Sequence, residues 1–230
     1  MGIAYGVTTN FQATKGIVQD GLVFNLDAAV KESYSGGTTW RDLAGGNNGT
    51  FTNMTAANFN KSNGGILNFD GSDEYVDHGD ILDNLISDSL TMCCFCKLST
   101  LSGVRNLFSK GSSYWLHKEN STQKFRFKVE TSSGRKEAEA NLTLSTNQFY
   151  FVVGILNSSS ISIYVDGIKY TETSFSGTLT KTSYPLRVGG WWTGNDLFHG
   201  SIANASIYNR ALTAAEVSRN FNVMRHRFGI

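Results

Sequence analysis

Apolar and polar positions alternate along several segments of the chain. In KFRFKVE (124–130) charged and apolar residues alternate, which predicts an antiparallel strand with one face on a core and the other in water. FYFVVGI (149–155) is apolar on both faces and predicts a central strand. In ISIYVDGIKY (161–170) Asp166 and Gly167 separate two alternating runs, which predicts a β-hairpin with a type I′ turn.

Helix signals gather near the end of the chain. Thr213 and Glu216 have the spacing of a capping box, in which each side chain bonds to the other residue's backbone N–H. Val217, Phe221 and Met224 follow at spacings of four and three and form an apolar stripe. The pattern predicts one short C-terminal helix that docks on the sheets. No internal repeat is evident, which argues against a propeller or a solenoid.

Length and composition favour one β-rich domain. The 230 residues are 40% hydrophobic and include 24 Gly but 1 Pro, which is typical of short strands joined by tight turns. We therefore predict an all-β fold, a two-sheet antiparallel β-sandwich (jelly roll), with one short C-terminal α-helix. Residues 1–20 lack periodicity and are expected to form an N-terminal arm; residues 21–230 hold the sandwich, the helix and the tail.

The balance of charge limits the possible partners. The formal net charge is +1, so no broad field attracts a polyanion, and nucleic acid is not an expected partner. The basic run Arg219, Arg225, His226 and Arg227 is expected to be a solvated helix face and tail, whose arginines could still hold a neighbouring subunit. The chain contains no apolar stretch of about 18 residues and no signal-peptide pattern at its start, so we expect neither membrane insertion nor processing.

Cys93, Cys94 and Cys96 lie within four positions of one another. Neighbouring strand residues point to opposite faces, so a disulfide between adjacent positions is disfavoured, and an odd count leaves one thiol over. Because the chain has no second Cys or His cluster to complete a tetrahedral metal site, buried free thiols are the expectation. Free thiols fit assembly in a reducing compartment.

Taken together, the segments resemble the laminin-G-like, concanavalin A-like lectin/glucanase family over about residues 21–222. Their order and spacing are more specific than any single segment. The segments are GLVFNLDAA (21–29), LNFDGSDEYVDHGD (67–80), LTMCCFCKL (90–98) with RNLFSKG (105–111), FYFVVGI (149–155) with YVDGIKY (164–170), and LRVGG (186–190) leading to GSIANASIYNRALT (200–213).

Within that family, GLVFNLDAA, the loop around Trp40 and the ending MRHRFGI resemble the version found in structural proteins of tailed bacteriophages. The resemblance implies a virion protein, assembled in the host cytoplasm, that serves as a capsid decoration, a fibre or a tail appendage. Other virion proteins, and host or environmental glycans, are the implied partners, and we expect a homo-oligomer. The alternatives are a free carbohydrate-binding lectin module of cellular origin or a glycan hydrolase.

The resemblance also raises calcium, which similar folds often hold. Asp70 and Asp77 are the candidate ligands, because calcium takes oxygens from carboxylates and carbonyls on turns. The family usually has an acidic residue just after the Gly-x-Ile that corresponds to Gly200–Ile202, whereas this chain has Ala203 and then Asn204. Solvated turn carboxylates are therefore the alternative. The wider acidic cluster consists of Asp70, Asp73, Glu74, Asp77 and Asp80.

The candidate ligand-binding residues lie on one Gly-rich segment. Trp191 and Trp192 are consecutive, so at least one indole is expected to point away from the core. It could stack on a sugar ring, with Asn195 and Asp196 supplying hydrogen bonds; it could contact another subunit; or both indoles could simply pack inside.

We expect no enzymatic activity. Glucanases with this architecture use carboxylates that alternate along one strand, about 5–5.5 Å apart. The nearest pattern here is Glu137-Ala-Glu139, which lacks the middle acid. The histidines have no metal-ligand spacing and are expected on the surface or in loops, and no nucleophile elbow or phosphate-binding loop occurs.

Overall fold

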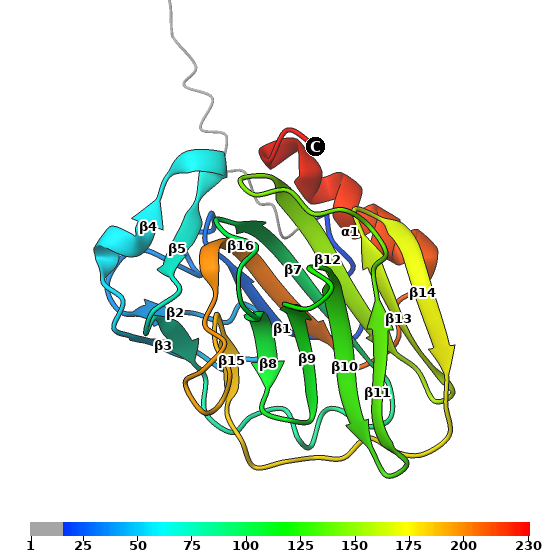
Figure 1. Cartoon of the computed structure of the whole chain (residues 1–230). Helices are drawn as coiled ribbons and strands as arrows, with labels where there is room; N and C mark the ends of the chain where they lie inside the picture. Colours follow the sequence, from blue (N-terminus) through cyan, green and yellow to red (C-terminus); the bar gives the residue numbers. More distant parts are fainter. Residues whose placement is uncertain (1–15) are drawn as a thin grey trace, which may run out of the picture.

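A computed structural model describes residues 16–230 as two antiparallel sheets that pack face to face (Figure 1). Each sheet has eight strands, and one α-helix, α1 (Ala214–Met224), covers the outer face of the first sheet. The predicted two-sheet sandwich with one C-terminal helix is thus confirmed. In the described part of the chain no helix is long and apolar enough to cross a membrane.

The first sheet, sheet A, has the strand order β14-β13-β12-β7-β16-β5-β4, and β1 pairs with β16 beside β5. Its long central strand β16 (His199–Tyr208) is paired with β7 (Leu90–Leu98) along one side. The remaining strands are β1 (Leu22–Asp27), β4 (Phe59–Asn60), β5 (Ile66–Asp70), β12 (Phe149–Leu156), β13 (Ser160–Val165) and β14 (Ile168–Ser174).

The second sheet, sheet B, has the order β11-β10-β9-β8-β15-β6-β3-β2. Its strands are β2 (Thr39–Trp40), β3 (Gly49–Thr52), β6 (Tyr75–Asp77), β8 (Arg105–Lys110), β9 (Tyr114–Lys118), β10 (Phe125–Thr131), β11 (Gly134–Glu139) and β15 (Leu186–Val188). Short 3-10 turns are η2 (Ala56–Asn58), η3 (Ser62–Gly64) and η4 (Arg225–Arg227).

Two apolar layers hold these elements together. The main core lies between the sheets, and a second cluster lies between sheet A and α1, where Val217 and Met224 are buried against Phe95 and Phe151. Burial of this kind is the main source of stability in a domain of this size. The thiols of β7 divide between the layers: Cys94 and Cys96 face the main core, and Cys93 faces the helix side. All are free and buried, as predicted.

The local predictions from sequence are confirmed at the hairpin and the helix. Asp166 and Gly167 have φ values of 51° and 80°, and they connect β13 to β14. At the start of α1 the Thr213 hydroxyl accepts from the Glu216 N–H, and the Glu216 carboxylate accepts from the Thr213 N–H. In β10 the residues alternate between buried and half-buried along the whole strand.

The expected N-terminal arm falls largely outside the described residues. Of its last residues, Ile17 and Val18 are buried in the cluster beneath α1. The Val18 N–H donates to the side-chain oxygen of Asn220, 2.8 Å away. This part of the segment therefore packs on the sandwich.

The expectation of a wholly solvated basic tail is wrong for Arg227. Its Nη1 donates to both carboxylate oxygens of Asp27 of β1, at 3.0 and 2.9 Å, while Nε and Nη2 donate to the carbonyls of Asn63 and Gly65. The side chains of Arg227 and Asp27 are 4% and 1% exposed. The partner is 200 residues away in sequence, so no local pattern could reveal it.

The two sheets pack tightly where Gly154 of β12 faces the Phe127 ring of β10. A Cβ at position 154 would lie 2.3–2.7 Å from ring atoms of Phe127, which is nearer than atoms can approach. We expect Gly154→Ala to lower the free energy of unfolding by about 1–3 kcal/mol, measured by urea titration. Combined with Phe127→Leu, the loss should be smaller than the sum of the two single losses. Strictly additive losses would contradict a clash at this point.

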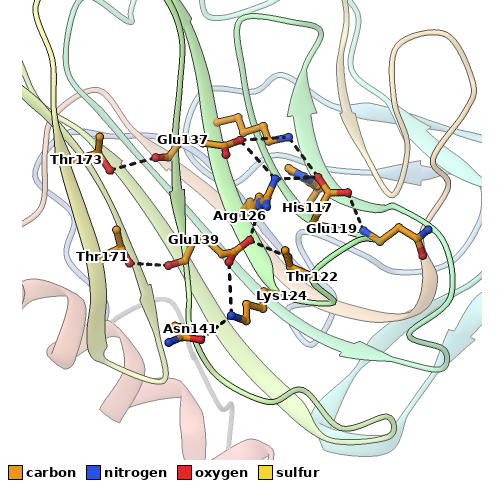
Figure 2. A network of polar contacts seen from close by, with 12 residues as sticks. His117, Glu119, Thr122, Lys124, Arg126, Glu137, Glu139, Asn141, Thr171 and Thr173 are labelled. Atoms are coloured by element: carbon orange, nitrogen blue, oxygen red, sulfur yellow. Dashed lines mark hydrogen bonds and ion pairs between the residues drawn. The ribbon is translucent and has the colours of Figure 1, made fainter.

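Side chains of β14 close one side of the sandwich. The Thr171 hydroxyl donates to the carbonyl of Glu139 at 2.7 Å, and the Thr173 hydroxyl donates to the carbonyl of Glu137 at 3.2 Å (Figure 2). Those carbonyls belong to β11, the end strand of sheet B. The edge strands of the two sheets are thus joined through side chains.

Candidate functional site

The outer face of sheet B carries a continuous row of side chains across the strands. Residues that lie directly opposite each other in paired strands point to the same face. Following the register from β3 to β11, the row consists of Thr50, Asp77, Arg187, Ser109, Trp115, Lys128 and Glu137. The face opposite the main core is therefore polar, with one tryptophan near its middle.

Trp115 is 6% exposed although it lies outside the main core. The ring of Trp191 meets it edge-on with 5.1 Å between ring centroids, and the guanidinium carbon of Arg135 lies 5.2 Å from its ring. The Ser109 hydroxyl donates to the carbonyl of Gly190 at 2.9 Å. These contacts place the start of the segment Trp191–Asp196, here named the tryptophan loop, over β8 and β9.

One guanidinium fixes the tryptophan loop to the sheet. Arg187 of β15 donates to the carbonyls of Trp191 and Trp192, at 3.1 and 2.9 Å, and forms an ion pair with Asp77 at 2.8 Å. The same guanidinium lies 4.2 Å from the ring of Tyr75. Because Arg187 joins the loop to two strands at once, the loop is held in one position.

The structure brings the four predicted ligand-binding residues together on this loop. Trp191 and Trp192 are half-buried and belong to neither apolar cluster, whereas Asn195 and Asp196 are exposed. The Trp192 ring stacks on Tyr184 with 3.9 Å between centroids. Simple core packing of both indoles is thus not observed, and the sugar and subunit alternatives stay open.

Beside the loop, ion pairs link the ends of β9, β10 and β11 (Figure 2). Arg126 contacts Glu139 at 2.6 Å and Glu119 at 3.2 Å. Lys128 lies 3.4 Å from Glu119 and 3.5 Å from Glu137. Cations and carboxylates alternate across the strands, so each charge has partners of opposite sign.

These partners keep the carboxylates ionised. Burial by itself raises the pKa of Glu119, but the hydrogen bond from the Asn120 N–H and nearby positive charges, those of Lys128 and Arg126 among them, outweigh burial and lower that pKa to about 2. Burial also opposes the shift at Glu139, yet hydrogen bonds from Thr122 and Arg126 lower its pKa. A glycosidase needs one carboxyl that is protonated at neutral pH. Neither Glu119 nor Glu139 meets that requirement.

The expectation that the histidines lie on the surface or in loops is wrong for His117, which lies in β9, whereas His78 lies in the loop that follows β6. Both are buried, and His117 points to the outer face of β9 with Nε2 3.5 Å from Glu119. Burial, followed by the charge of Lys128, lowers the pKa of His117 to about 3. The ring is therefore neutral at physiological pH. The alternation of Trp115, His117 and Glu119 in the sequence was a signal that could have placed these side chains on one face.

The calcium candidates Asp70 and Asp77 lie in different sheets, at the end of β5 and in β6. Asp77 accepts from Arg187 and from the Gly79 N–H, and Asp70 accepts from the Ser72 N–H. From residue 16 onward, no group of three or more His, Cys, Asp or Glu side chains is arranged to hold a metal. These two carboxylates do not fit a shared calcium site.

Two curved antiparallel sheets, with a polar outer face and a covering loop, define a lectin-like jelly roll. The sequence profile of the concanavalin A-like lectin/glucanases superfamily matches residues 70–218. The chain belongs to this superfamily. None of the curated proteins matches the chain in sequence.

Solved structures share the fold at low sequence identity. Trypanosoma rangeli sialidase in complex with the inhibitor DANA has a TM-score of 0.63 at 16% identity, with 89% of this chain and 33% of that chain covered. The botulinum neurotoxin serotype D binding domain has 0.64 at 13%, with 88% and 52% covered. Domain 4 of AbnA, an arabinanase of Geobacillus stearothermophilus in complex with arabinotriose, has 0.60 at 15%, with 90% and 100% covered. The chain thus spans a third to a half of the sialidase and toxin chains.

Proposed function

We propose that this chain is a non-catalytic binding module whose contact face is the outer face of sheet B together with the tryptophan loop. The observation that carries the proposal is the position of Trp191 and Trp192, which are half-buried, lie outside both apolar clusters and are fixed to the sheet by Arg187. Rigid aromatic side chains that are already held in place lose little entropy on binding. They favour stacking on a flat partner.

The proposed ligand is a glycan. An indole face matches the apolar face of a sugar ring, while the exposed Asn195 and Asp196 can bond to its hydroxyls. The superfamily and the arabinotriose complex of AbnA domain 4, whose whole chain is covered by the match, support this proposal. A contact with another protein subunit is the competing use of the same surface.

We further propose that the module is displayed on the virion of a tailed bacteriophage, as a capsid decoration, a fibre or a tail appendage. The resemblance of GLVFNLDAA and MRHRFGI supports this placement, and the buried free thiols fit assembly in a reducing cytoplasm. Other virion proteins and further copies of the chain would be its neighbours. Mass spectrometry of purified particles tests the placement, and absence of the chain from the particles would overturn it.

A lectin module of cellular origin is the second candidate, since the match covers all of AbnA domain 4, a module of a secreted arabinanase. Hydrolysis is disfavoured by the pairing of Glu137 and Glu139 with Arg126. Release of sugar from β-glucan by the purified chain would contradict the non-catalytic part of the proposal.

Trp191→Ala is expected to weaken glycan binding by about 10-fold or more, because it removes the stacking surface and uncovers Trp115. Glycan arrays that include arabino-oligosaccharides, sialylated glycans and β-glucans identify the ligand, and calorimetry measures the loss. Ile168→Ala is the control: Ile168 is 61% exposed and lies on β14 of sheet A. Equal glycan binding by Trp191→Ala and the unmodified chain would contradict the proposal that this face binds the glycan.

A further inference from the structure

A buried ammonium lies where two separate segments meet at the end of β8. The Lys110 side chain is 0% exposed, and its Nζ donates to Asp80 and lies 3.4 Å from Asp83, both in the segment between β6 and β7. It also donates to the carbonyls of Thr182 and Tyr184, at 3.1 and 2.6 Å, in the segment that leads into β15. Two carboxylates and two carbonyls therefore surround one positive charge.

This set of ligands is the set that a hard cation takes. Calcium in proteins is bound by carboxylate and backbone carbonyl oxygens on irregular segments. Here the oxygens come from positions about 30 and 70 residues away from Lys110, on segments that flank the paired strands β6 and β15, so the cation adds a side-chain link between those segments. An ammonium offers the same sign of charge and directional N–H groups.

The pKa values of the two acidic partners shift in opposite directions. The hydrogen bond from Lys110 is the main cause that lowers the pKa of Asp80. The pKa of Asp83 is raised, first by burial and then by its hydrogen bond with Asp80. Two carboxylates that face a single positive charge would be matched better by a divalent ion.

The backbone of the acidic segment is strained at this point. Leu82, between the two aspartates, is buried and has a φ of 73°, a left-handed conformation that is unfavourable for residues other than glycine. Its carbonyl accepts from the N–H groups of Leu85 and Ile86 at 2.9 and 3.0 Å. The turn brings both Asp80 and Asp83 within ion-pair distance of the ammonium.

We propose that the Lys110 ammonium is a built-in cation that occupies, in place of a calcium ion, the oxygen cage formed by Asp80, Asp83 and the carbonyls of Thr182 and Tyr184. The junction is then closed without any divalent ion. The carbonyl of Tyr184 is part of the cage, and the Tyr184 ring stacks on Trp192. The same cation therefore supports the residue on which the tryptophan loop packs. The proposal does not depend on the ligand of that loop, and its test uses stability alone.

The test is to remove the ammonium and offer calcium. Lys110→Met keeps an apolar stem and leaves the four oxygens without a cation. For this variant we expect 5 mM calcium chloride to raise the melting temperature by about 3–6 °C, given the affinities of extracellular calcium sites. The unmodified chain and Lys169→Met, which removes an exposed lysine of β14, should shift by less than about 1 °C. Magnesium should act more weakly, because it demands closer ligands.

The triple variant Lys110→Met, Asp80→Asn, Asp83→Asn is the matched control, since it keeps the shape of the cage and removes its charge. It should not respond to calcium. If Lys110→Met is unfolded without metal, recovery of its circular dichroism spectrum on addition of calcium supports the proposal. A folded Lys110→Met without a calcium response would overturn it. An equal rise in melting temperature for the unmodified chain would also overturn the proposal. The same holds if Lys110→Met is unfolded and calcium does not restore it while the triple variant folds.

Discussion

Arg227→Ala is expected to lower the free energy of unfolding by about 3–5 kcal/mol, the usual cost of leaving one member of a buried ion pair alone. Without the guanidinium, the hydrogen bond from the Ala29 N–H, 2.9 Å long, is the one that remains to the Asp27 carboxylate among the described residues. Burial already raises the pKa of Asp27, against the opposing charge of Arg227. Without Arg227 the carboxyl must take up a proton or remain as an uncompensated charge, and both cost stability. Urea titration followed by circular dichroism measures the loss.

Arg225→Ala provides the control in the same turn. Arg225 lies over the ring of Phe221 and forms no ion pair with the described residues, so its loss should cost about 1 kcal/mol or less. The double variant Asp27→Asn, Arg227→Met should be more stable than Arg227→Ala, because it leaves no unpaired charge. A cost at Arg227 no larger than at Arg225 would mean that the ion pair is not what closes the C-terminal end on β1.

Lowering the pH from 7 to 5 is expected to reduce the free energy of unfolding by about 3–4 kcal/mol through two histidines. Burial lowers the pKa of His78 to about 4, and burial followed by the charge of Lys128 lowers that of His117 to about 3. Both rings are buried, and the Nδ1–H of His78 donates to the carbonyl of Asn47 at 2.8 Å.

Stability falls at low pH because the unfolded and folded chains bind different numbers of protons. Below pH 6.5 the unfolded chain binds protons on these rings, whereas the folded chain does not until about pH 4. Stability is therefore full above pH 6.5 and falls by about 1.4 kcal/mol per pH unit for each ring as the pH drops. Below pH 4.5 the protonation of Glu119, whose folded pKa is about 2, adds to the loss.

Urea midpoints at pH 7, 6 and 5 measure this dependence. His117→Gln should reduce the slope by about half. An unchanged midpoint between pH 7 and pH 5 would show that these rings are not held neutral in the folded chain.

The features that sequence could predict are those set by neighbouring residues. The Asp166-Gly167 turn, the Thr213–Glu216 capping box and the alternation in β10 depend on residues within a few positions of one another. The adjacency of Trp191 and Trp192 predicted that at least one indole points away from the core, and the structure places both on a loop outside the two apolar clusters.

The features that sequence could not predict depend on register between distant strands. Arg187 reaches the tryptophan loop and Asp77 only because β15 pairs with β6 in one particular register. His117 counts as a loop or surface residue until β9 is known to lie under that loop. Lys110 looks like an ordinary charged strand residue, and its partners are identified only once the segments around residues 80 and 182 are brought together.

The threonines of β14 protect the end strand of sheet B from pairing with strands of other molecules. An end strand such as β11 normally offers free carbonyls to any strand of a neighbouring molecule, and this is how sheets from separate molecules polymerise. Here the carbonyls of Glu137 and Glu139 already accept from Thr173 and Thr171 of the same molecule. These two carbonyls are therefore not free to accept from a strand of a neighbouring molecule, which disfavours the growth of a fibril along this edge even at high protein concentration.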